Sequence, residues 1–208
     1  MPTPASLPAS LPASLPASLP ASLPASLPAS LPASWPVSAP RLPHRSGDGF
    51  VVLRDGSRRW GRFGAAGVLV RYVDAEQTPW YFVARRSEHC HRGGTWAVPG
   101  GALDEGETPL EGALREFAEE IGVDLPELDV VAVHEDGHGG WSYWTHLVDI
   151  PERFDPPVTY NWETADARWV RGDELADLDL FAELRRTLVH LAVLGNGQRV
   201  GQERPPTR

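Results

Sequence analysis

The alternation of apolar and polar residues along the chain predicts a series of short strands interrupted by one strongly amphipathic helix. Strands are expected in the stretches "FVVLRDG", "GAAGVLVRYVD", "WYFVARRS", "GGTWAVPGG", "LDVVAVHED", "GWSYWTHLVDI" and "DARWV". The stretch "DAEQTP" indicates a hairpin connection, and "GDELADLDLFAELRRTLVHLAV" indicates one or two closing helical segments. Strands on both sides of a helix predict an α/β domain with a mixed sheet.

The amphipathic helix is expected to run from Thr108 or Pro109 to Ile121. Thr108 is suited to cap its N-terminus, Pro109 fits the first helical position, and Glu111 completes a capping box. Gly122 follows the last apolar position as a C-cap. At about 100° per residue, one face collects apolar side chains and is expected to pack into the core. These side chains belong to Leu110, Ala113, Leu114, Phe117 and Ile121, with Ala118 at the edge.

Beside the apolar face, Glu116, Glu119 and Glu120 form a contiguous acidic arc. Arg115 lies on the flank, four residues from both Glu111 and Glu119. No other basic residue separates the three acids, so their repulsion of a few tenths of a kcal/mol per pair is uncompensated. A solvated acidic face is one interpretation. The other interpretation is a binding site for a divalent cation. Hard ions take carboxylate and carbonyl oxygens, and the nearby "PGG" turn can bring a carbonyl close.

The stretch from Gly101 to Val123 resembles the Nudix box of the Nudix hydrolases. It reads glycine, five residues, Glu107, seven residues and then "REFAEEIGV", which agrees with the family pattern at every fixed position. Phe117 stands where the family usually has an aliphatic residue and keeps the apolar character. The resemblance extends to "GGTWAVPGG" before the box and "NWETADARWV" after it. It implies a Nudix fold, which is a mixed β-sheet sandwiched between α-helices.

The resemblance also implies a set of site residues. Glu116, Glu119 and Glu120 would bind Mg²⁺ or Mn²⁺ together with the carbonyl of Gly100, and Arg115 and Glu107 would orient the acids. Metal ions at such a site neutralise a diphosphate, clamp it and lower the pKa of a bound water. A carboxylate within hydrogen-bond reach can then take the proton. Glu163 is the candidate outside the box for that general base or for a further metal ligand.

Two further positions are candidates for substrate binding. Arg85 and Arg86 alternate on a strand, so only one of them can face a pocket. Arg85 is the candidate for a contact with a substrate phosphate, with ordinary surface charge as the alternative. Trp144 is the aromatic candidate for stacking a nucleobase, with core packing as the alternative. Trp162 is likewise an aromatic candidate for stacking a nucleobase, with core packing as the alternative. The stretch "HCHRGG" invites a zinc interpretation, but no second ligand pair at a suitable spacing supports it.

The N-terminal part of the chain differs from the rest. "LPAS" repeats from Leu7 to Ser34, and a proline at every fourth position excludes an α-helix. Residues 1–46 are therefore expected to be a disordered, proline-rich tail, residues 47–197 a Nudix hydrolase domain, and residues 198–208 a disordered C-terminal tail. No apolar run is long enough to span a bilayer, and no export signal is evident.

Composition narrows the classes of function. The chain has 208 residues and a formal net charge of −9, which argues against general nucleic-acid binding. All basic residues are arginines, so lysine-dependent chemistry such as Schiff-base formation is excluded. One cysteine, Cys90, excludes an internal disulfide, and a cytoplasmic location is expected. A homodimer is left open.

These observations together predict a metal-dependent Nudix hydrolase that cleaves a nucleoside diphosphate derivative by water attack at phosphorus. A nucleoside triphosphate, including an oxidised one, is slightly favoured because the domain is short, and ADP-ribose or another nucleotide sugar is the alternative. The rival class is a non-catalytic Nudix-fold module that senses a nucleotide, although all the acids of the box are present. An isomerase acting on isopentenyl diphosphate is a third option, for which Cys90 in a loop gives poor support.

Overall fold

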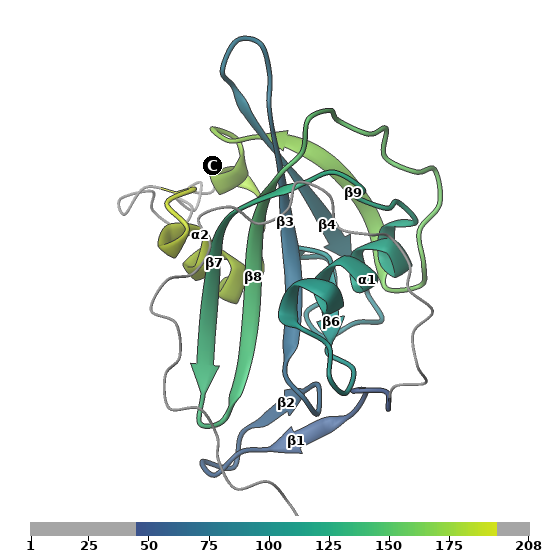
Figure 1. The fold of residues 1–208 in the computed structure, drawn as a ribbon, viewed down its shortest axis with the longest axis vertical. Helices are drawn as coiled ribbons and strands as arrows, with labels where there is room; N and C mark the ends of the chain where they lie inside the picture. Colours follow the sequence, from purple (N-terminus) through teal and green to yellow (C-terminus); the bar gives the residue numbers. More distant parts are fainter. Residues whose placement is uncertain (1–44, 195–208) are drawn as a thin grey trace, which may run out of the picture. The chain divides into compact units, whose positions relative to one another are not determined.

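The computed structural model describes residues 45–194 (Figure 1). The two tails expected from the sequence lie outside these residues except for positions 45 and 46. Within residues 45–194, no helix is both long enough and apolar enough to cross a membrane. The elements are β1 (Phe50–Val52), β2 (Arg58–Trp60), β3 (Ala65–Val73), β4 (Pro79–Arg86), β5 (Trp96–Ala97), β6 (Gly100–Ala102), α1 (Pro109–Ile121), β7 (Asp129–His138), β8 (Trp141–Asp149), β9 (Thr164–Arg171), the 3-10 helix η1 (Leu175–Asp177) and α2 (Ala182–His190).

Seven of the strands form one mixed sheet, as the sequence predicted. Its order is β5-β4-β3-β8-β7, with β6 paired to β3 and β9 paired to β4. The β3–β8 pair is parallel and all other pairs are antiparallel. The connection from Asp74 to Thr78 is a tight hairpin loop, because the Asp74 carboxylate accepts hydrogen bonds from the backbone of Glu76 and Thr78 and from the Trp80 indole. Strands β1 and β2 form a separate two-stranded sheet.

Helices cover both faces of this sheet, so the expected sandwich is confirmed (Figure 1). Successive side chains of a strand point to opposite faces. On β3, Val68 and Val70 therefore join the core beneath α1, whereas Leu69 joins the core beneath α2. Phe117 of α1 and Leu188 of α2 are both fully buried against their respective faces. The sheet is thus the rigid platform on which α1 is held.

Helix α1 has the bounds and the caps that the sequence predicted. The Thr108 side chain and Glu111 form the capping box, Pro109 begins the helix, and Gly122 ends it in a left-handed conformation. The buried face differs in part from the expected one, because Leu110 and Leu114 are only half-buried. The buried residues of the helix include an acid, and they are Gly112, Ala113, Phe117, Glu120 and Ile121.

The segment before β1 is attached to the loop that precedes α1. The backbone N–H of Gly47 donates to the Asp104 carboxylate at 2.9 Å, and the N–H of Glu105 donates to the Arg45 carbonyl at 3.1 Å. Gly47 is buried there, and a Cβ atom at this position would collide with the carbonyl of Leu103. A residue larger than glycine would therefore push the segment off the loop. This attachment fixes residues 45–48 beside α1.

Candidate functional site

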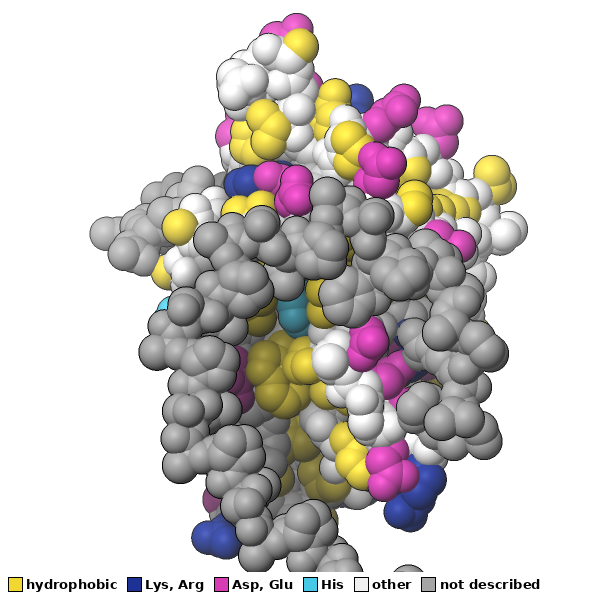
Figure 2. Space-filling view, in the orientation of Figure 1, with side chains coloured by type: hydrophobic (Ala, Val, Ile, Leu, Met, Phe, Trp, Pro, Cys, Tyr) yellow, Lys and Arg dark blue, Asp and Glu magenta, His cyan; other side chains and the backbone are white. Residues whose placement is uncertain are grey.

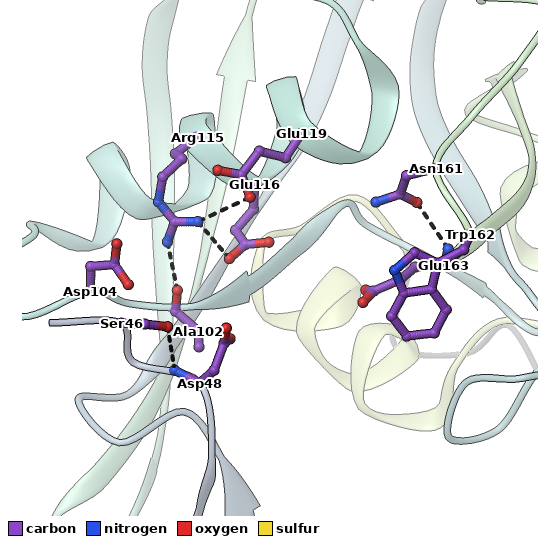
Figure 3. A pocket seen from close by; sticks show the side chains of 10 residues that line it. All are labelled: Ser46, Asp48, Ala102, Asp104, Arg115, Glu116, Glu119, Asn161, Trp162 and Glu163. Carbon is purple, nitrogen blue, oxygen red and sulfur yellow. Dashed lines mark hydrogen bonds and ion pairs between the residues drawn. The ribbon is translucent and has the colours of Figure 1, made fainter. Parts of the chain in front are cut away.

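A cleft of about 360 Å³ lies beside the acidic side of α1 (Figure 3). Four parts of the chain meet there: α1, the β6 strand with the loop after it, the segment before β1, and the turn before β9. Acidic side chains are prominent on the face of the molecule that carries α1 (Figure 2). The residues that line the cleft are Ser46, Asp48, Ala102, Asp104, Arg115, Glu116, Glu119, Asn161, Trp162 and Glu163.

Arg115 organises the acids around it. Its Nε and Nη2 atoms donate to the two carboxylate oxygens of Glu107 at 2.9 and 3.0 Å, in a forked pair. Its Nη1 atom donates to Glu116 at 2.8 Å and to Glu119 at 3.4 Å, and Nη2 also donates to the carbonyl of Ala102 at 2.7 Å. Burial by itself lowers the pKa of the guanidinium, but the bonds to Glu107 and Glu116 raise it overall, so Arg115 stays charged.

Glu107 joins this arrangement to the loop. Its side chain is 4% exposed, and besides the pair with Arg115 it accepts a hydrogen bond from the backbone N–H of Asp104 at 2.8 Å. Because Arg115 is on α1 and Glu107 is on the preceding loop, their pair holds the loop against the helix. Arg115 in turn contacts Glu116 and Glu119, so the pair links the loop to two of the acids.

The three acids of α1 occupy three different environments. The Glu119 side chain is 59% exposed, the Glu116 side chain is 16% exposed, and Glu120 is buried at 7%. Burial raises the pKa of Glu116 to about 7, with Arg115 opposing the rise and the charges of Glu119 and Glu163 adding to it. Burial also raises the pKa of Glu120 to about 8, and the charges of Glu116 and Glu163 reinforce that rise. Negative charge is therefore crowded and partly desolvated at this site.

Glu163 reaches the same cleft from the opposite wall. The turn that carries it is closed by Asn161, whose side-chain oxygen accepts hydrogen bonds from the backbone N–H groups of Glu163 at 3.0 Å and Thr164 at 3.2 Å. The carbonyl of Glu163 accepts from the N–H of Ser87 at 2.7 Å, and the N–H of Asn161 donates weakly to the Glu120 carbonyl at 3.5 Å. These bonds tie the turn both to the end of β4 and to α1.

The donor set of the cleft fits a hard divalent cation, although it is not already arranged as a cage. Carboxylate and carbonyl oxygens are the ligands that Mg²⁺ and Mn²⁺ prefer. A cation would also stabilise the ionised forms of Glu116 and Glu120, which burial and mutual repulsion disfavour. Gly100 lies beside these acids, since its backbone hydrogen-bonds Glu120. In the described part of the chain, however, no three acidic, histidine or cysteine side chains converge closely enough to hold one ion.

The two predicted substrate-binding residues do not line the cleft. Arg85 is exposed at the end of β4, where its Nε donates to the carbonyl of Gly94 at 3.1 Å. Its neighbour Arg86 is the arginine whose charge acts on Glu120 and lowers that pKa. The strand alternation was foreseen: Arg86 follows Phe82 and Ala84 on the face beneath α1, and Arg85 follows Val83 on the face beneath α2. Trp144 is half-buried against the core beneath α1 and packs over Gly64.

Several residues of the cleft were not singled out in the sequence. Ser46 and Asp48 lie in the segment before β1, and their place in the cleft depends on the attachment of Gly47 to Asp104. No local pattern indicates that long-range contact. Asn161 could have been found, because an asparagine two residues before the acid is the usual start of a turn closed by its side chain.

Comparison with known proteins agrees with this geometry. The NUDIX domain family model matches residues 62–191. A Mycobacterium tuberculosis protein named "Putative 8-oxo-dGTP diphosphatase 3" is 42% identical over 142 residues, which cover 64% of each chain. The "Nucleoside triphosphatase NudI" of Enterobacter sp. is 32% identical over 111 residues, covering 49% of this chain and 79% of that one.

Among solved structures, the Nudix hydrolase RenU of M. smegmatis is similar with a TM-score of 0.60 and 36% sequence identity, covering 72% of this chain and 100% of that chain. The alignment with the M. tuberculosis relative leaves about a third of that protein unmatched, since it spans 64% of its length. The region that the family model matches, residues 62–191, contains the whole seven-stranded sheet, α1 and the turn of Glu163. The chain belongs to the NUDIX family.

Proposed function

We propose that this protein is a hydrolase that cleaves a phosphoanhydride bond of a nucleoside triphosphate, with Mg²⁺ or Mn²⁺, by attack of water at phosphorus. The observation that carries the proposal is the placement of Glu163 across one cleft from Glu116 and Glu119 (Figure 3). The family membership supports it, and so do the names of two relatives, an 8-oxo-dGTP diphosphatase and a nucleoside triphosphatase. The substrate is therefore a small nucleotide.

The acids of α1 and the Gly100 carbonyl would hold the metal ions. When bound, such ions neutralise the diphosphate, clamp it and make a coordinated water more acidic. Arg115 contributes by holding Glu116 and Glu119 toward the cleft, since it bonds both of them and is itself fixed on Glu107. The guanidinium is fully engaged with protein oxygens, so it positions the acids and is not available to grip phosphate.

Glu163 would take the proton from the attacking water. It lines the cleft, its turn is fixed by Asn161, and it comes from a different element than the other acids. A general base needs this kind of placement, within reach of the water but outside the set that holds the cation. Glu119, whose side chain is exposed at the cleft, is accessible to a cation that arrives with the substrate.

The first test is a panel of dGTP, 8-oxo-dGTP, ATP and ADP-ribose incubated with Mg²⁺, Mn²⁺ or EDTA, with the phosphorus products identified. Hydrolysis of a triphosphate that requires the cation is expected. Running the reaction in ¹⁸O-labelled water shows which phosphorus is attacked, because only that product carries the label. Turnover of ADP-ribose alone would contradict the proposed substrate class, and turnover of any substrate in excess EDTA would contradict the role of the cation.

Charge-neutral variants then test the individual roles. Glu119→Gln and Glu120→Gln are expected to raise the Mg²⁺ concentration needed for activity and to lower turnover by orders of magnitude. Glu163→Gln is expected to lower kcat by about 10²–10⁴-fold, the range for loss of a general base, with little change in the Mg²⁺ requirement. Glu127→Gln, in an exposed loop, is the matched control. A fully active Glu163→Gln variant would show that another group is the general base.

A further inference from the structure

Trp162 is the apolar surface of an otherwise polar cleft. Trp162 is 69% exposed, which is unusual for a residue type that gains so much from burial. Among the described residues that line the cleft, Ala102 is the only other apolar one. Most of Trp162 is thus open toward solvent beside Glu163.

Hydrogen bonds within the turn fix the backbone that carries this ring. Trp162 and Glu163 are the two central residues between Asn161 and Thr164, and Thr164 N–H donates to both the carbonyl and the side-chain oxygen of Asn161. Just before the turn, the Tyr160 ring packs on the core and its hydroxyl donates to the Ala167 carbonyl at 3.1 Å. The anchored tyrosine and the closed turn fix the backbone, so the exposure of Trp162 does not come from a loose loop.

The cleft has two unlike walls. The acids of α1 and Arg115 crowd one wall, and a phosphate chain can approach these acids only through cations (Figure 3). The turn with Trp162 forms the opposite wall, where the flat, uncharged indole lies beside the carboxylate of Glu163 (Figure 3). A nucleotide has the same division, with a charged phosphate chain at one end and a flat, uncharged base at the other.

We infer that Trp162 is the base-stacking platform of this site, so that a nucleobase lies on the indole while the phosphates extend toward α1. The inference rests on the proposed function for the identity of the ligand, and it adds the residue that binds the base. Stacking of a base on an aromatic side chain contributes about 1–3 kcal/mol by alanine substitution, because every base has a π-face. Trp162→Ala should therefore weaken nucleotide binding by roughly 5- to 150-fold.

The experiment compares a probe that has a base with one that has none. Binding of dGTP and of inorganic triphosphate is measured by calorimetry with Ca²⁺, for the full chain and for Trp162→Ala, Trp162→Phe and Trp60→Ala. Trp60 is the matched control, an exposed tryptophan on β2 outside the cleft. Thermal unfolding of each variant confirms that it is folded.

The expected result is a large loss of dGTP affinity in Trp162→Ala, most of it restored in Trp162→Phe, and unchanged binding of triphosphate in both. Equal dGTP affinity in Trp162→Ala and Trp60→Ala would overturn the inference, and so would equal losses for dGTP and triphosphate. Because binding is measured without turnover, the two proposals fail separately. Trp162-dependent dGTP binding without hydrolysis would refute the proposed function alone, and hydrolysis with no effect of Trp162→Ala on binding or KM would refute the platform alone.

Discussion

The buried carboxylate of Glu120 makes a quantitative prediction about stability in the absence of metal. Burial raises the pKa of this acid from the ordinary value of 4.5 to about 8. Between those two values the folded protein holds a proton that the unfolded chain releases. The contribution of Glu120 to stability is therefore fully present below about pH 4.5 and is lost as the pH rises through about 8.

The size of the effect follows from the shift. Each pKa unit corresponds to about 1.4 kcal/mol, so the full shift would amount to something on the order of 5 kcal/mol. Glu116 and Glu163 contribute to the same shift by repulsion, so some of it is shared among the three acids. In the wild type, the ionisation of Glu120 lowers the free energy of unfolding as the pH rises. We expect Glu120→Gln to abolish about 2–5 kcal/mol of this decrease, because the amide cannot ionise.

The assay is urea unfolding in EDTA, followed by tryptophan fluorescence, at several values from about pH 5 to about pH 9. The free energy of unfolding of the wild-type protein should fall more steeply over this range than that of Glu120→Gln. Glu127→Gln removes the same charge from an exposed loop and should keep the wild-type slope. Addition of Mg²⁺ near pH 8 should stabilise the wild type more than Glu120→Gln, since a cation replaces the proton. Parallel curves for wild type and Glu120→Gln would refute the reasoning.

Three further substitutions have distinct expected outcomes. Arg115→Met removes the cation that pairs with the buried carboxylates of Glu107 and Glu116, and urea unfolding should show a loss of about 3–5 kcal/mol together with loss of activity; an unchanged midpoint would contradict the central role of this side chain. Gly101→Ala places a Cβ atom 2.5 Å from the Glu116 carboxyl carbon, so it should displace that side chain and raise the Mg²⁺ concentration required for turnover, whereas Gly137→Ala meets only ordinary contacts and should not. Phe117→Ala empties a fully buried site in the core beneath α1 and should cost about 3–5 kcal/mol in unfolding experiments, with a smaller loss indicating that the core collapses into the space.

Local features of α1 could be predicted because they depend on nearby residues. The capping box, the proline at the first helical position and the glycine C-cap act over three or four residues, and the bounds of the helix followed from them. The three acids and Arg115 lie on neighbouring turns of one helix, so their meeting is fixed by helical periodicity. The strand in the stretch of β3 was likewise predicted, because its run of apolar residues is local.

Other features depend on contacts between distant parts of the chain. Glu120 was placed on an acidic arc with its neighbours, but the packing of α1 on the sheet buries it while Glu119 stays exposed. The choice between Arg85 and Arg86 depends on which face of β4 the helix α1 covers, and that face is the one of Phe82 and Ala84. Trp144 is partly covered because β8 lies next to β3 beneath α1, whereas Trp162 is open because its turn stands beyond the edge of that core.

By itself, the sequence determined the family and the helix that carries the acids. The tertiary structure decided which carboxylates are buried, that the turn of Glu163 faces α1, and that the segment of Ser46 and Asp48 completes the cleft. The physical reason is the separation along the chain over which each interaction acts. Helical spacing and capping act within a few residues, whereas burial and the resulting pKa values depend on segments that are brought together only when the sheet has formed.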